Sequence, residues 1–492
     1  MRCLSCLFVV SILLVGCSKN TSKVHVENEQ FKAEIITLKD YFEIPGLAVS
    51  IEKDGETIYR DHLGYADNEA ATPLDSSYLF PIASITKVFT GVLVMKLVED
   101  QRLSLDDPVN AYLDNSTLGD SILVKHILSH TSQGNVGKEF YYSSRFGLLT
   151  QVIERASGKS FEMAMSEEIF RPLSLQNTFL LKDESQLKTK QKQLVKPYIL
   201  DDGIKEGFID FGFSASAGIV SNLDDLALFN KALDENSIIS KASKNTMFSS
   251  FNKDLPYAYG IFNKKFKDLN LVWAYGQYDC YSSLFLKIPE QHITLTILAN
   301  NNLMSDPARL IYGDAMSSLF VLSFLKNYVY KIEGMPLFEN TDSNAGTPDA
   351  SSEFYRKKLL AEALSESFMA RFDADKLQSS ATLLHKVFEE HPNYLDYADL
   401  NLLHNLSFLK DIAFYMELGD FNDFDTHIIK IGEKLLSLDP NNPYVNVYLG
   451  TFYDRNGDID KARYYFKQIR DAENFSRNWY TVESENWLKN NP

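Results

Sequence analysis

The sequence predicts an α+β domain followed by an all-α domain. Strand-like runs occur near residues 45–59 and 273–299 with helical stretches between them, which favours one sheet assembled from distant segments. Beyond residue 353, strand-like runs become rare and long amphipathic stretches dominate. The chain has 492 residues, of which 45% are hydrophobic and 13% aromatic, so it can build large packed cores and is not disordered.

The charge balance argues against a polyanionic partner. The 49 basic and 66 acidic residues give a formal net charge of -17, and no basic stripe offsets it. Because nucleic-acid binding depends on neutralising phosphates with Lys and Arg, we expect no nucleic-acid partner.

The N-terminus predicts export and anchoring. Residues 1–16 carry one Arg and an apolar run too short to span a bilayer, which is typical of a signal peptide. The ending Leu14-Val-Gly-Cys17 resembles the lipobox of bacterial lipoproteins, which implies lipidation of Cys17, residues 17–30 as a lipidated tether, and a place in the cell envelope. Ser18 after the cysteine resembles outer-membrane sorting, with the protein on the periplasmic face. The alternative is an ordinary signal peptide with an incidental cysteine.

Residues 31–333 form the predicted α+β domain. Two β-favouring runs flank Lys53-Asp54-Gly55, the pattern of a hairpin with a tight turn. The segment Trp273 to Ala299 contains two or three further strand-like runs.

A turn-rich linker at 334–352 precedes a helical domain at 353–492. Near its end, six residues and an earlier proline have the spacing of the tetratricopeptide repeat: Leu449, Gly450, Tyr453, Gly457, Ala462, Phe466 and Pro440. The pattern predicts tetratricopeptide-like helical hairpins, with a plain helical bundle as the alternative.

The chemistry is expected at Ser84 and Lys87. The pattern S-x-x-K occurs at six serines, but only at Ser84 does it stand at the start of a long apolar helix, with Pro81 at the expected helix entry. A separation of three puts both side chains on one helical face. A buried lysine can accept a serine proton because desolvation disfavours its ammonium form, which makes Ser84 a candidate nucleophile.

These residues, with their context, resemble the serine β-lactamase and penicillin-binding-protein family, most closely its class C, esterase and DD-peptidase-like branch. Five blocks carry the resemblance in the order found in that branch: Gly46 to Gly55, Leu103 to Val109, Ile127 to Ser132, Gly158 to Phe161 and Ile169 to Leu173. The resemblance implies an antiparallel sheet flanked by helices, with an all-helical subdomain.

The family also implies a tyrosine that shares the proton with Ser84 and Lys87. The candidate segment is Phe140-Tyr-Tyr-Ser-Ser144, in which the spacing favours Tyr142 and leaves Tyr141 open. Ser144 stands where the family often has an asparagine that contacts the substrate.

A third motif should lie on the strand that lines the site. The match is Tyr275-Gly276-Gln277, followed by Tyr278, and its backbone N–H groups would serve the oxyanion and the substrate. An aromatic first residue resembles the esterase members, and Gln277 in place of glycine could narrow the substrate space. The alternative is a core strand without a catalytic duty. His126 and His130, four residues apart, are expected to cap or pack beside the site, and no metal is predicted.

The sequence therefore predicts a serine hydrolase that cleaves an ester or amide through an acyl-enzyme on Ser84, with no cofactor. A DD-peptidase or β-lactamase acting on peptidoglycan or β-lactams, and a catalytically degenerate binding or scaffold lipoprotein, remain the alternatives. The expected partners are a small ester, amide or peptide substrate, a membrane reached through the lipid anchor, and a protein bound by the helical domain.

Overall fold

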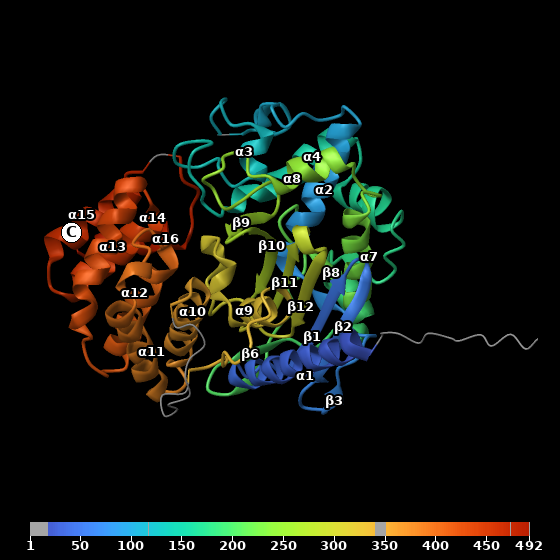
Figure 1. Ribbon diagram of the computed structural model, residues 1–492. Helices are drawn as coiled ribbons and strands as arrows, with labels where there is room; N and C mark the ends of the chain where they lie inside the picture. The colour runs from blue at the N-terminus through green and yellow to red at the C-terminus, as the bar shows by residue number, and fades with distance from the viewer. Residues whose placement is uncertain (1–17, 117, 340–350, 473, 492) are drawn as a thin grey trace, which may run out of the picture.

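A computed structural model describes residues 18–116, 118–339, 351–472 and 474–491. At its centre is an antiparallel sheet with the strand order β3-β2-β1-β12-β11-β10-β9 (Figure 1). The strands are β1 (Gly46–Lys53), β2 (Glu56–Asp67), β3 (Thr72–Pro73), β9 (Phe262–Phe266), β10 (Leu269–Tyr278), β11 (Tyr281–Ile288) and β12 (Ile293–Ala299). β1 pairs with β12, from Leu47 opposite Ala299 to Lys53 opposite Ile293, so the predicted joining of distant segments is confirmed.

The first hairpin has the turn that its sequence predicts. Asp54 and Gly55 separate β1 from β2 and have φ angles of 53° and 82°. Two successive positive φ angles define the turn whose twist matches the flanking strands, and Asp-Gly is a favoured pair for it.

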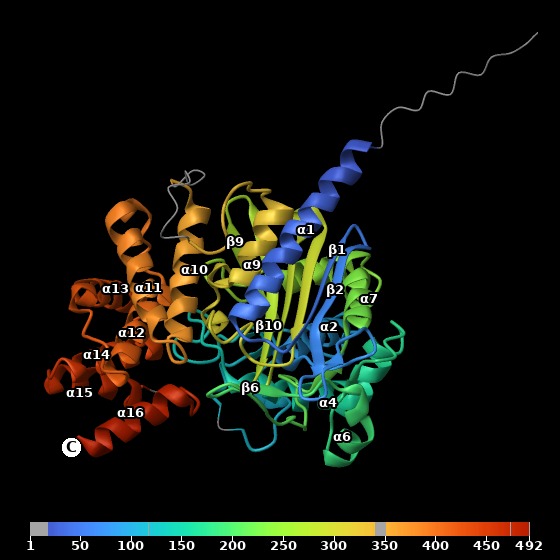
Figure 2. The ribbon, with the colours of Figure 1, turned by 90° about the horizontal axis from the view of Figure 1, so that it is seen from below.

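Each face of the sheet is covered by helices (Figure 2). One face, with Trp273 and Leu286, packs on α1 (Ser18–Tyr41) and α9 (Leu319–Phe324). The opposite face, with Ala274 and Phe285, packs on α2 (Thr86–Glu99) and α7 (Leu223–Asp234). Since side chains alternate across a strand, Trp273 and Ala274 face different cores.

A mostly helical subdomain completes this part of the chain. Its helices are α3 (Val124–Leu128), α4 (Leu149–Ser157), α5 (Phe161–Met165), α6 (Glu184–Lys190) and α8 (Lys241–Phe248). Two small sheets accompany them, formed by β4 (Phe80–Pro81), β8 (Ile219–Ser221) and β5 (Phe179–Leu180), and by β6 (Tyr198–Leu200) and β7 (Ile204–Glu206).

The C-terminal part is helical, as predicted. It consists of α10 (Glu353–Met369), α11 (Asp375–His385), α12 (Leu400–Tyr415), α13 (Asp425–Leu438), α14 (Pro443–Arg455), α15 (Ile459–Arg470) and α16 (Trp479–Asn490). Helices α14 and α15 form the hairpin expected from the repeat pattern. A Cβ atom at Gly450 would lie 2.9 Å from the ring of Phe466, so the glycine allows the two helices to approach closely.

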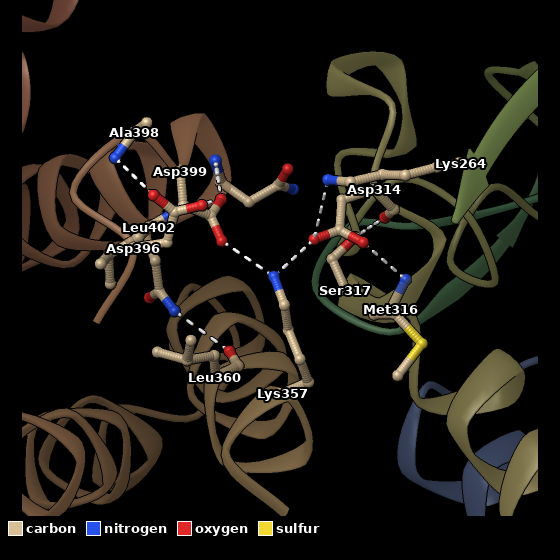
Figure 3. Close-up of polar contacts among 12 residues, drawn as sticks. Lys264, Asp314, Met316, Ser317, Lys357, Leu360, Asp396, Ala398, Asp399 and Leu402 are labelled. Atoms are coloured by element: carbon tan, nitrogen blue, oxygen red, sulfur yellow. Dashed lines mark hydrogen bonds and ion pairs between the residues drawn. The ribbon is translucent and has the colours of Figure 1, made fainter. Parts of the chain in front are cut away.

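The helical domain is docked onto the sheet domain. One continuous apolar core extends from the α1 face of the sheet into helices α10 to α16. At the boundary, Nζ of Lys357 in α10 lies 2.7 Å from a carboxylate oxygen of Asp314 and 3.0 Å from one of Asp399, which precedes α12 (Figure 3). The lysine holds the pKa of the buried Asp314 carboxyl well below its usual range.

The N-terminal segment differs in part from the expectation. Helix α1 begins at Ser18, inside the segment predicted as a tether, and Asn28 accepts a hydrogen bond of 2.5 Å from the hydroxyl of Tyr328. The predicted signal peptide, Cys17 and residues 340–350 of the predicted linker lie outside the described residues. None of the helices in the part of the chain that the structure describes is both long enough and apolar enough to span a bilayer.

Candidate active site

Ser84 lies in a short 3-10 turn, residues Ala83–Ile85, between β4 and α2. Pro81 does not begin the helix as predicted, because it belongs to β4 and pairs with Val220 of β8. Ala83 has a φ of 45°, in the left-handed region that costs a non-glycine residue about 1–3 kcal/mol. The neighbouring strand and helix hold this conformation, and Ser84 remains half-buried at the edge of a cavity.

Lys87 occupies the first turn of α2 with its side chain buried in the subdomain. Its Nζ lies 2.9 Å from Oγ of Ser84 and 3.0 Å from the carbonyl oxygen of Ser216. Burial lowers the pKa of the amine from 10.5 to about 7. A substantial fraction of Lys87 is therefore neutral near pH 7 and has a lone pair available for the serine proton.

The two adjacent tyrosines point in opposite directions. Tyr142 lines the same cavity as Ser84, whose hydroxyl acts on the pKa of its phenol, and Nζ of Lys87 lies 4.9 Å from the centre of its ring. Burial raises the pKa of the Tyr142 phenol, so it stays protonated. Tyr141 instead donates a hydrogen bond to Asp439 of the helical domain. The structure thus brings Tyr142, and not Tyr141, to the serine and the lysine.

His130 packs against the ring of Tyr142. Its ring stacks on the tyrosine ring with centroids 4.3 Å apart, and its Nδ1 accepts the backbone N–H of Ser143 at 3.0 Å. Burial, with a smaller contribution from Lys87, lowers the pKa of His130 well below its usual value, so the ring is neutral. His126 is placed differently, with its Nδ1 accepting the backbone N–H of Leu123.

Ser144 is not at the cavity. It is exposed at the start of a 3-10 turn, Ser144–Leu148, and is absent from the cavity lining. The structure does not bring this predicted substrate contact to the other site residues. The carbonyl oxygen of Ser216 reaches Lys87 instead, and no motif in the sequence singled it out.

Strand β10 passes directly beside the nucleophile turn. A Cβ atom at Gly276 would lie 2.2 Å from the carbonyl oxygen of Ile82, so only glycine allows this approach. Ser283 of the neighbouring strand donates a hydrogen bond to the same carbonyl at 2.9 Å. Tyr275, Gln277 and Tyr278 line the cavity, and Gln277 donates to Asp306 at 3.0 Å.

These residues open into a cavity of about 690 Å³, a size typical of small-molecule sites. One side includes Ser84, Tyr142 and the end of β10, and Asp210, Asp279 and residues 309–312 also belong to the lining. The other side, which we call the helical wall, is formed by His404, Phe408 and Asp411 of α12, Val447, Tyr448 and Thr451 of α14, and Trp479 and Glu483 of α16. Among the described residues, no group of three or more His, Cys, Asp or Glu side chains is placed to hold a metal ion.

Comparisons with known proteins match two parts of the chain to known families. Residues 37–314 match the family described as Beta-lactamase, and residues 432–464 match the tetratricopeptide repeat. Protein flp of Staphylococcus aureus (strain MW2) is 24% identical over 305 residues, which are 53% of this chain and 60% of that protein. Penicillin-binding protein 4* of Bacillus subtilis is 24% identical over 337 residues, 58% of this chain and 74% of that protein. The chain thus spans less than two thirds of the length of the first of these relatives.

Two solved structures share the fold. The octameric penicillin-binding protein homologue from Pyrococcus abyssi has a TM-score of 0.56 and 25% identity, covering 68% of this chain and 81% of that one. The D-amino acid amidase from Ochrobactrum anthropi has a TM-score of 0.50 and 18% identity, covering 56% of this chain and 91% of that one. The likeness to the amidase shows the fold alone.

Proposed function

Because the chain belongs to the β-lactamase family, we propose that it is a serine hydrolase that cleaves an ester or amide bond through an acyl-enzyme on Ser84. One observation carries the proposal: Oγ of Ser84, Nζ of Lys87 and the phenol of Tyr142 meet at the edge of a cavity of small-molecule size. A hydroxyl, a base of lowered pKa and a protonated acid are the groups that acyl transfer requires.

The steps follow from the protonation states. Neutral Lys87 takes the proton of Ser84 while Oγ bonds to the carbonyl carbon, and the carbonyl π electrons move to the oxygen. The backbone N–H groups of Ser84 and of Gln277 or Tyr278 are proposed to hold this oxyanion, and each such donor contributes about 3 kcal/mol. The oxyanion then reforms the carbonyl, the leaving group departs with a proton from Tyr142, and a proton returns from Lys87 to the phenol. Water resolves the acyl-enzyme by the reverse route.

Covalent labelling tests the proposal. We expect one fluorophosphonate adduct in the intact mass of the protein, absent in Ser84→Ala. Ser185→Ala is the matched control, because Ser185 also begins an S-x-x-K pattern but is exposed on α6, outside the cavity. If the wild-type chain takes up no adduct at high reagent concentration, the hydrolase proposal fails and the binding or scaffold lipoprotein is favoured.

The substrate class is a second question. Two of the similar proteins are named for penicillin binding, which favours a β-lactam or a peptidoglycan stem peptide as the second candidate. Rates for a short p-nitrophenyl ester, nitrocefin and a D-Ala-D-Ala peptide, compared on one preparation, separate the three. We expect the ester to be the best of them, since the third motif begins with the aromatic Tyr275.

Anchoring and partners are proposals that rest on sequence alone. We propose a lipidated Cys17 and an envelope location, which predicts that Cys17→Ala moves the protein from the membrane fraction to the soluble fraction of the producing cells. A protein partner for the repeat-like helices is proposed from the repeat pattern at residues 432–464.

A further inference from the structure

The cavity above Ser84 belongs to two domains at once. The side with Ser84 and Tyr142 comes from the β-lactamase-like domain, and the helical wall comes from α12, α14 and α16. Trp479 at the start of α16 is 42% exposed although it is a large aromatic residue, and Phe408 of α12 is half-buried. Aromatic surface beside a catalytic cavity is what a substrate can contact.

A hydrogen-bonded chain joins the wall to the rim of the cavity. Arg309, which lines the cavity, donates from Nε to Nε2 of His404 at 3.3 Å and from Nη1 to Asp306 at 3.3 Å. Since a guanidinium stays protonated, Nε2 of His404 must be the acceptor, and Nδ1 therefore carries the hydrogen. Nδ1 then donates to the hydroxyl of Tyr448 at 2.9 Å, and this hydroxyl is bonded to that of Tyr312.

Arg145 makes further hydrogen bonds between the two domains. Arg145 follows the catalytic tyrosine by three residues and donates to Ser476 at 2.8 Å and to the carbonyl oxygen of Asn474 at 2.9 Å. The Lys357 ion pairs of Figure 3 are a further polar contact between the two domains. The wall is therefore fixed in position and not loosely tethered.

The wall carries little free charge. Asp411 is ion-paired with Arg455, and Arg455 also acts on the carboxyl of Glu483. Beside these two carboxylates the wall presents the apolar or aromatic side chains Phe408, Val447, Tyr448 and Trp479, on which the uncharged, apolar part of a substrate can pack.

We propose that the C-terminal helical domain is part of the substrate site: Trp479 and Phe408 contact the end of the acyl group remote from the scissile bond, and His404 holds the wall at its distance from Ser84. This inference rests on the proposed hydrolase function and adds to it a role for the repeat-like domain inside the enzyme. Trp479 is a specificity-determining residue, and His404 is a positioning residue.

Esters of graded acyl length test the proposal, because a short acyl group does not reach the wall. For Trp479→Ala we expect kcat/KM for p-nitrophenyl octanoate to fall about tenfold, mainly through KM, since an apolar contact is lost. Hydrolysis of p-nitrophenyl acetate and labelling of Ser84 by a small fluorophosphonate should fall much less than hydrolysis of the octanoate. Tyr464→Ala is the matched control, an exposed aromatic of α15 that does not line the cavity.

The positioning role has its own pair of variants. His404→Leu removes both bonds of the imidazole and should lower the octanoate to acetate ratio as Trp479→Ala does. His404→Gln keeps an acceptor for Arg309 and a donor for Tyr448, and should restore most of that ratio. A general folding defect would lower kcat/KM for both esters together, and it would affect His404→Leu and His404→Gln alike.

The possible outcomes separate the two proposals. Absence of a Ser84 adduct in the wild-type protein refutes the hydrolase itself. If Ser84 is labelled but Trp479→Ala and Tyr464→Ala share one chain-length profile, the hydrolase stands and the role of the wall is refuted. A loss of labelling in Trp479→Ala as large as the loss of octanoate hydrolysis also refutes that role, because the residue would then act on the nucleophile.

Discussion

The lowered pKa of Lys87 makes a quantitative prediction for the pH dependence of catalysis. Burial moves the pKa of its amine from 10.5 to about 7. At pH 7 about half of the amine is then neutral, against roughly 0.03% for an ordinary lysine, a gain on the order of a thousandfold in available base. At pH 5 the neutral fraction falls to about 1%, and at pH 9 it approaches one. We therefore expect kcat/KM to rise about 50-fold from pH 5 to 7 and only about twofold from pH 7 to 9.

The assay is kcat/KM for a short p-nitrophenyl ester between pH 5 and 9, with the hydrolysis by buffer alone subtracted. Lys87→Arg keeps the charge but cannot lose its proton, so it should be about 100-fold slower or worse. His130→Asn is the control for the other titratable group beside Tyr142. Because burial holds the pKa of His130 well below its usual range, this variant should keep the midpoint near pH 7 even if it is slower.

Two results would refute the reasoning. One is a wild-type profile that is flat from pH 6 to 9, and the other is a midpoint that disappears in His130→Asn.

The pH dependence of protein stability tests independently whether the pKa of Lys87 is lowered. Between pH 7 and 10.5 the unfolded chain binds a proton that folded Lys87 has lost, so the free energy of unfolding should rise with pH there. Lys87→Met should be more stable than wild type at pH 6, by at most about 5 kcal/mol.

Three further predictions concern the proton donor, the domain boundary and a buried carboxyl. Tyr142→Phe should lower kcat by about 100-fold, whereas Tyr141→Phe should keep most of kcat, because the Tyr141 hydroxyl is bonded to the helical domain. Equal losses of kcat in the two variants would contradict the assignment of Tyr142 as the proton donor. Lys357→Met leaves the mostly buried carboxylates of Asp314 and Asp399 without the cation between them, so the free energy of unfolding measured in urea should fall by about 3–5 kcal/mol. An unchanged urea midpoint of unfolding would contradict the docked interface. Burial raises the pKa of the Glu52 carboxyl from 4.5 to about 7, so the folded chain keeps this proton to a higher pH than the unfolded chain, and the free energy of unfolding should fall as the pH rises from 4.5 to 7. Glu52→Gln should abolish this fall and be more stable than wild type at pH 8 by up to about 3 kcal/mol. Parallel curves of stability against pH for the two proteins would instead show that the carboxyl is ionised.

Local chemistry explains which features could be predicted from the sequence. The Asp54-Gly55 turn specifies its own hairpin, and an apolar helix after Ser84 distinguishes one S-x-x-K pattern from five others. Pro81 misled the prediction, because a residue that is favoured at helix starts also fits a short strand. The start of α1 at Ser18 cannot be predicted from the sequence, because residues 18–30 are polar and lack a helical stripe.

The helical wall could not be predicted, because its contacts join residues far apart in the chain. Arg309 and His404 are 95 residues apart, and Arg145 and Ser476 are 331 apart. Neither pair has a spacing that a helix or hairpin imposes, and each residue alone has an ordinary surface or packing role in most proteins. Only the docking of the two domains turns His404 and Trp479 into cavity residues.

The adjacent residues Tyr141 and Tyr142 have different functions: the first contacts the helical domain, and the second is the proposed proton donor. The first side chain is buried against the helical domain and the second aims its hydroxyl at the serine. Consecutive Cα atoms keep a separation of about 3.8 Å, so a slide of the interface that carries Tyr141 along also drags the neighbouring phenol off its target. Replacing the repeat-like module with a foreign one, by recombination or by design, would therefore require the proton donor to be re-aimed at the same time.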